Sequence, residues 1–128
     1  MQQFEITVAT SKSFDAAVAA VEQKAVENGF RVLHTHDVAA TLTDKGFPRP
    51  PLKIVEVCNA RYASQILERD IRIALMLPCP IAVFVEKDEV RISTFLPSTI
   101  SQFFPDADVA GIAAEVETAV LKIVEEAR

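Results

Sequence analysis

The chain has 128 residues, of which 50% are hydrophobic, and 13 basic against 18 acidic side chains give it a net charge of −5. This length suits one compact domain with a hydrophobic core, and the apolar content excludes a disordered chain. The negative charge argues against nucleic-acid binding, which depends on neutralising phosphates. We therefore expect a single domain over residues 1–128 that does not bind DNA or RNA.

The first half of the chain predicts two strands and two helices. Apolar and polar residues alternate over residues 3–10, which is typical of a strand with one buried face. A helix follows from Phe14 to about Asn28, and four of its apolar residues fall on one stripe: Phe14, Val18, Val21 and Ala25. Residues 30–36 predict a second strand, and residues 37–45 a short helix. The proline cluster at 47–51 predicts a surface connection.

The second half begins with a strand over residues 52–58, whose apolar content indicates burial on both sides. Asn59 is a favourable N-cap for a helix that runs to about Asp70. Residues 81–85 and 90–95 predict a hairpin, because residues 86–89 form a short polar connector.

A short helix over residues 97–104 and a closing helix over residues 107–127 complete the predicted order of elements. We therefore predict an α+β fold: a mostly antiparallel sheet with long N- and C-terminal helices packed on it.

The longest apolar stretch runs from Ile73 to Val85 and is interrupted by Pro78 and Pro80. It is shorter than the roughly 20 residues that a membrane-spanning helix needs, so we interpret it as a buried strand pair or turn. No secretory signal is visible at the start of the sequence, although a chain whose signal had been removed would look the same. We expect no membrane association and a cytoplasmic location, where the two cysteines remain thiols.

Two cysteine motifs give the sequence a family resemblance. The segment 55–60 reads Val-Glu-Val-Cys-Asn-Ala, and the segment 73–79 reads Ile-Ala-Leu-Met-Leu-Pro-Cys. Together they resemble the central signature of the domain of unknown function 302 family, and nearly the whole chain fits the family pattern. The sequence departs from the common form at Ala60, where proline often follows the asparagine, and at Pro80 after the second cysteine. The resemblance implies an α+β fold, a homodimer and no established activity.

The cysteines are the strongest candidates for chemistry. Cys58 is predicted just before the N-terminus of a helix, where the helix dipole favours an anion and lowers the pKa of a thiol. Alternatively, Cys58 packs as a small apolar side chain. Cys79 lies between Pro78 and Pro80, which restrict its backbone and fix the direction of the thiol, or which only end one segment before the next strand. The spacing of the cysteines matches no CxxC motif.

Arg61 lies near the predicted helix start, where its guanidinium and the backbone donors can bind a carboxylate, phosphate or sulfur oxyanion. Alternatively, Arg61 is solvated. His34 and His36 share one face of a predicted strand, but their spacing matches no zinc signature. We expect no metal and no cofactor.

Two functional hypotheses remain. The first is a dimeric, non-enzymatic binding or interaction module that holds a small anionic ligand or a partner near Cys58, Asn59, Arg61 and Cys79. The second is a thiol-based sulfur-transfer or redox protein in which Cys58 reacts and Cys79 resolves or positions the product. In either case we expect both sulfurs to border one cleft, also lined by Asn59 or Arg61, that admits a small anion.

Overall fold

The computed structural model describes residues 3–128 and contains one five-stranded antiparallel sheet in the order β1-β5-β4-β3-β2. The strands are β1 (Glu5–Thr10), β2 (Arg31–Asp37), β3 (Leu52–Cys58), β4 (Cys79–Glu86) and β5 (Glu89–Phe95). The helices are α1 (Phe14–Glu27), α2 (Val38–Asp44), α3 (Ala60–Arg69), α4 (Ile100–Phe103) and α5 (Ala110–Ala127), with 3-10 helices η1 (Ile71–Met76) and η2 (Pro97–Thr99). The predicted α+β class is confirmed.

Short polar side chains begin the helices of the first half of the fold. The hydroxyl of Ser13 accepts a hydrogen bond from the backbone N–H of Ala16 at 3.2 Å and caps α1. The carboxylate of Asp37 accepts from the N–H of Ala40 at 2.9 Å and caps α2. Gly29 ends the first helical segment with a φ of 81°, a backbone conformation that residues with a side chain rarely adopt.

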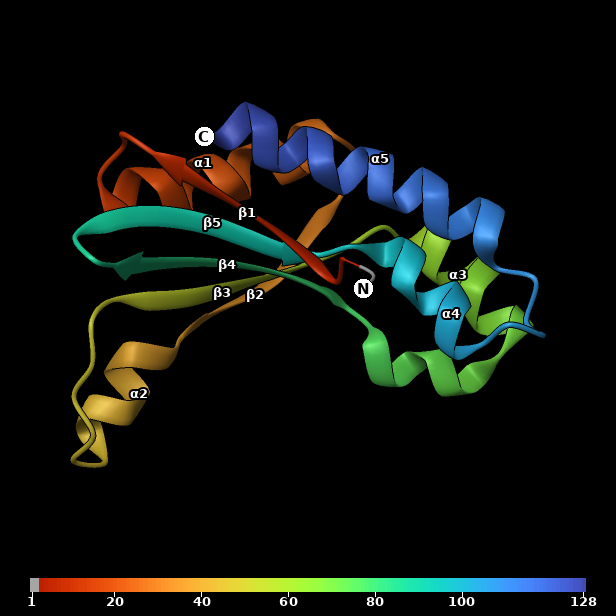
Figure 1. The fold of residues 1–128 in the computed structure, drawn as a ribbon, viewed down its shortest axis with the longest axis horizontal. Coiled ribbons are helices and arrows are strands. Elements are labelled where there is room, and N and C mark those ends of the chain that lie inside the picture. The colour runs from red at the N-terminus through yellow and green to blue at the C-terminus, as the bar shows by residue number, and fades with distance from the viewer. Residues whose placement is uncertain (1–2) are drawn as a thin grey trace.

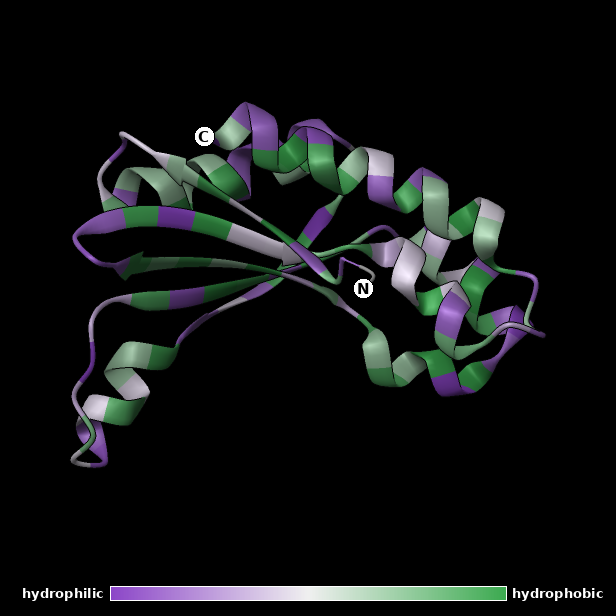
Figure 2. Cartoon of the chain, in the orientation of Figure 1, coloured by the Kyte–Doolittle hydropathy of each residue, from purple (hydrophilic) through white to green (hydrophobic). Residues whose placement is uncertain are grey.

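The hydrophobic core lies between one face of the sheet and the two long helices. Figure 1 shows α1 and α5 side by side on that face, and Figure 2 shows apolar residues alternating with polar ones along α5. Fully buried side chains from the sheet include Val55, Val57, Ile81, Val83 and Ile92, and those from the helices include Val21, Val120 and Ile123. Because β-strand side chains alternate between faces, this core uses every second residue of the central strands.

Within residues 3–128, no long helix packs on the opposite face of the sheet. One row of side chains crosses it from β1 to β2, as the strand register shows: Thr7, Ser93, Ala82, Ile54 and His36. Ile54 is only half-buried. The expectation that residues 52–58 are buried on both sides is therefore wrong, because both long helices pack on the same face. We call this second face the uncovered face.

Two further expectations need correction. Residues 73–85 do not form a strand pair or turn: η1 precedes β4, and the carboxylate of Asp70 accepts from the N–H of Arg72 at 2.9 Å to begin η1. The hairpin connector is also tighter than expected, because β4 and β5 continue to a two-residue turn at Lys87 and Asp88, with φ values of 52° and 64°. Positive φ at both positions matches the twist of the flanking strands.

We expect the two faces of the sheet to contribute unequally to stability. Ile81→Ala should lower the free energy of unfolding by about 2–5 kcal/mol, because it leaves a cavity in the core. Ile54→Ala, the matched change on the uncovered face, should cost less than about 1.5 kcal/mol, because that side chain is already partly hydrated. Urea denaturation of both variants at low protein concentration measures the difference. Equal losses would contradict a one-sided core.

Candidate functional site

Cys58 and Cys79 lie on neighbouring strands at one end of the sheet. Cys58 is the last residue of β3, Cys79 is the first residue of β4, and the residue paired with Cys79 in the register is Val57. From ordinary strand spacing, the Cα atoms of the two cysteines are about 6 Å apart. Both are free thiols, Cys58 half-buried and Cys79 buried.

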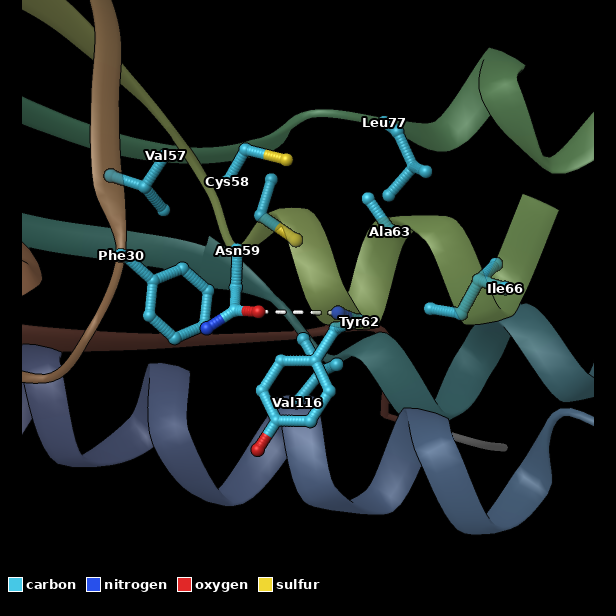
Figure 3. Close-up of a pocket in the computed structure, with 10 residues that line it drawn as sticks. Phe30, Val57, Cys58, Asn59, Tyr62, Ala63, Ile66, Leu77 and Val116 are labelled. Carbon is cyan, nitrogen blue, oxygen red and sulfur yellow. Dashed lines mark hydrogen bonds between the residues drawn. The ribbon is translucent and has the colours of Figure 1, made fainter.

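The two cysteines line one small cavity between the sheet, α3 and α5, shown in Figure 3. Its other walls are Phe30, Val57, Asn59, Tyr62, Ala63, Ile66, Leu77 and Val116. The rings of Phe30 and Tyr62 lie 6.4 Å apart between centroids. The cavity volume is about 20 Å³, which is room for one water molecule. It is therefore smaller than the cleft expected to admit a small anion beside the thiols.

Asn59 fixes the geometry of this corner through both ends of its side chain. Its Oδ1 accepts from the backbone N–H of Tyr62 at 3.1 Å and caps α3, the interaction drawn as a dashed line in Figure 3. Its Nδ2 donates to the carbonyl oxygen of Gly29 at 3.0 Å. One side chain thus joins the start of α3 to the turn between α1 and β2, which makes Asn59 a positioning residue for the cavity.

Burial controls the acidity of both thiols. It raises the pKa of Cys58 above its ordinary value. It raises the pKa of Cys79 to about 11, and the neighbouring Cys58 contributes in the same direction. Desolvation of the thiolate therefore opposes the lowering of the Cys58 pKa that was expected from the α3 dipole. Burial thus favours the protonated form of both thiols.

Arg61 lies outside the thiol cavity. It lines a separate polar cleft of about 180 Å³ together with Asn59, Tyr62, Gln65 and Glu115. Within residues 3–128, no carboxylate oxygen lies within 4.0 Å of its guanidinium. Asn59 and Tyr62 line both spaces, so the four candidate residues form two adjoining sites, a thiol cavity and an arginine cleft.

The two histidines form a cluster of their own on the uncovered face. Their rings meet edge to face with centroids 4.5 Å apart, and His36 Nε2 lies 2.6 Å from Glu56 Oε1. In the part of the chain that the structure describes, no three His, Cys, Asp or Glu side chains are grouped so as to hold a metal ion. Likewise, none of the described helices combines the length and apolar character that crossing a bilayer requires.

An apolar groove that the sequence patterns did not predict lies on the uncovered face, at the end of the sheet where the two cysteines lie. The groove has a volume of about 240 Å³ and is lined by Phe4, Leu75, Met76, Leu77, Pro78, Pro80 and Phe95. Leu75 is 88% exposed and Phe4 is 58% exposed. A signal was available in β4, where Pro80, Ala82 and Phe84 keep the second face apolar as well as the first.

Comparison with known proteins agrees with the fold. A family model described as domain of unknown function DUF302 matches residues 6–127. The chain is also similar to a crystal structure of an uncharacterized conserved DUF302 protein from Bacillus stearothermophilus, with 26% sequence identity and a TM-score of 0.93, over 99% of this chain and 100% of that chain. No match is found among curated proteins. The resemblance inferred from the two cysteine motifs is confirmed.

The pKa shifts predict slow thiol labelling of the native protein. At pH 8, iodoacetamide should modify Cys58 more slowly than free cysteine, and Cys79 at least about tenfold more slowly than Cys58, because burial disfavours the thiolate and restricts access. Peptide mass spectrometry over a time course measures both rates, and the Cys58→Ser and Cys79→Ser variants serve as single-thiol controls. Rapid modification of Cys58 at pH 7 would contradict this arrangement.

Proposed function

This chain belongs to the family described as domain of unknown function DUF302, and from that premise we propose that it is a dimeric, non-enzymatic binding module. The observation that carries the proposal is the uncovered face, where half-buried Ile54, Ala82 and Phe84 lie on the side of the sheet without a long helix. Monomeric proteins rarely expose contiguous apolar patches larger than a few hundred Å². The free thiols fit the reducing environment of the cytoplasm, which we propose as its location.

The arginine cleft is the best-supported place for a small anionic ligand. Arg61 supplies a guanidinium with no carboxylate within 4.0 Å in residues 3–128, close to the start of α3. Glu115 lines the same cleft and repels a simple dianion. The cleft therefore suits a ligand that joins one anionic group, held by Arg61, to an N–H or O–H group that donates to Glu115, as an amino acid does.

Ligand binding can be tested with amino acids as probes, and inorganic sulfate, a simple dianion, serves as the weaker-binding comparison. The amino acid that binds most tightly should raise the thermal unfolding midpoint of the wild-type protein. Arg61→Ala should weaken binding at least about tenfold by calorimetry, because it removes a charge-assisted hydrogen bond worth roughly 1.5–3 kcal/mol. Lys87→Ala, in the exposed turn at the far end of the sheet, is the matched control and should bind normally. If no amino acid and no sulfate changes the thermal unfolding midpoint, the cleft is not a ligand site.

A thiol function is the second candidate, because the shared cavity favours a reaction between the two sulfurs. A peroxide oxidises the Cys58 thiol to a sulfenic acid and is itself reduced to water or an alcohol. The Cys79 thiol then attacks that sulfur, forms the disulfide and releases water. The Cα separation of about 6 Å lies inside the range of roughly 4.4–6.8 Å that a disulfide needs.

Oxidation with hydrogen peroxide tests this candidate directly. The wild-type protein should lose two hydrogens, and peptide mapping should find one Cys58–Cys79 linkage within a single chain. Cys79→Ser should instead accumulate sulfenic acid at Cys58, which dimedone captures, whereas Cys58→Ser should react much more slowly. Formation of only intermolecular disulfides, or reaction at Cys79 alone, would exclude the proposed order of attack.

A further inference from the structure

The segment between β2 and β3 projects from the body of the protein. Residues 38–51, which we call the arm, contain α2 and the proline-rich return, and Figure 1 shows the arm hanging below the uncovered face at one end of the sheet. No residue of α2 is buried. Phe47, near the tip, is 70% exposed. Most of this aromatic side chain is therefore left open to solvent.

The apolar groove lies on the same side of the sheet but at the other end. Its residues Pro80 and Phe95 point to the uncovered face, because their neighbours Ile81 and Thr94 are buried on the core side. The arm rejoins the sheet at Leu52, which pairs with Phe84, four residues along β4 from Pro80. That separation is about 13 Å along the strand, and no arm residue lines the groove of its own chain.

We infer that the arm of one copy binds the groove of a second copy, and that the reverse contact forms at the same time. This inference rests on the proposal that the chain is a dimer and names the surfaces that form it. Consider two copies whose uncovered faces are opposed, related by a two-fold axis that lies between the sheets, parallel to their planes and perpendicular to the strands. The arm end of each copy then lies over the groove end of the other. Such an exchange is self-complementary. Both arms and both grooves are occupied within one dimer, so no third chain can add.

Charge supports the same pairing. Phe47 stands between Lys45 and Arg49, and within residues 3–128 neither cation has a carboxylate oxygen within 4.0 Å. At the groove end, Glu5 pairs with Phe95 in the register, and Glu56 pairs with Pro80.

The groove is therefore an apolar pair flanked by two acids, and the arm tip is an aromatic residue flanked by two bases. Glu5 on β1 and Glu56 on β3 are three strand intervals apart, about 14 Å. Lys45 ends α2 and Gly46 turns the chain, so the two cations reach these carboxylates through their long side chains. We therefore expect Phe47 to fill the groove while the two cations meet the two carboxylates.

The test uses two complementary double variants in the full chain. K45E/R49E makes the arm acidic, so it meets an acidic groove, and E5K/E56K makes the groove basic, so it meets a basic arm. Each variant alone should dissociate at least about tenfold more readily than the wild-type dimer in analytical ultracentrifugation. An equimolar mixture should form dimers again, because each arm then meets a groove of opposite charge. Recovery on mixing also demonstrates that both variants are folded.

Two further variants complete the experiment. Phe47→Ala should weaken the dimer at least about tenfold without reversing any charge. K24E/K122E, the matched reversal on α1 and α5, should remain dimeric. A wild-type chain that is monomeric at high micromolar concentration would overturn both this inference and the proposed dimer. A wild-type dimer that persists in every variant would overturn only the arm exchange and would assign the interface to another surface.

Discussion

The packing of both long helices on one face of the sheet is the constraint on which the rest of the molecule depends. It concentrates the buried side chains of β3, β4 and β5 on a single side and leaves the other side to solvent. The helix α5 closes this core and also supplies Val116 to the thiol cavity and Glu115 to the arginine cleft. The same arrangement that holds the fold together therefore builds both candidate sites and leaves the uncovered face available.

The corner around Asn59 joins these features. The side chain caps α3 and holds the turn that follows α1, so the positions of Tyr62 and Phe30 are set by the same pair of hydrogen bonds. Because Asn59 and Tyr62 line the thiol cavity on one side and the arginine cleft on the other, a ligand that moved either residue would alter the surroundings of both sulfurs. The two candidate functions are thus physically linked rather than independent.

The local elements were predictable where a single residue decides them. Asn59 is a favourable N-cap and begins α3 as expected, and Ser13 and Asp37 likewise cap α1 and α2. What sequence could not decide was the number of covered faces. Ile54 and Val55 are both apolar, yet only Val55 is buried, because the placement of α1 and α5 depends on contacts between segments far apart in the chain. The raised pKa of Cys58 could not be predicted for the same reason, since its burial also comes from residues far away in the sequence, such as Phe30 and Val116.

The size of the thiol cavity has a consequence for the dynamics of the protein. A space that admits one water molecule excludes alkylating reagents, so modification of Cys79 requires that α3 separate briefly from the sheet. The rate at which Cys79 is modified then measures how often this corner opens, much as amide hydrogen exchange does for the backbone. Modification of the buried thiol thus reports local opening of this corner, and a ligand bound in the arginine cleft would slow that modification.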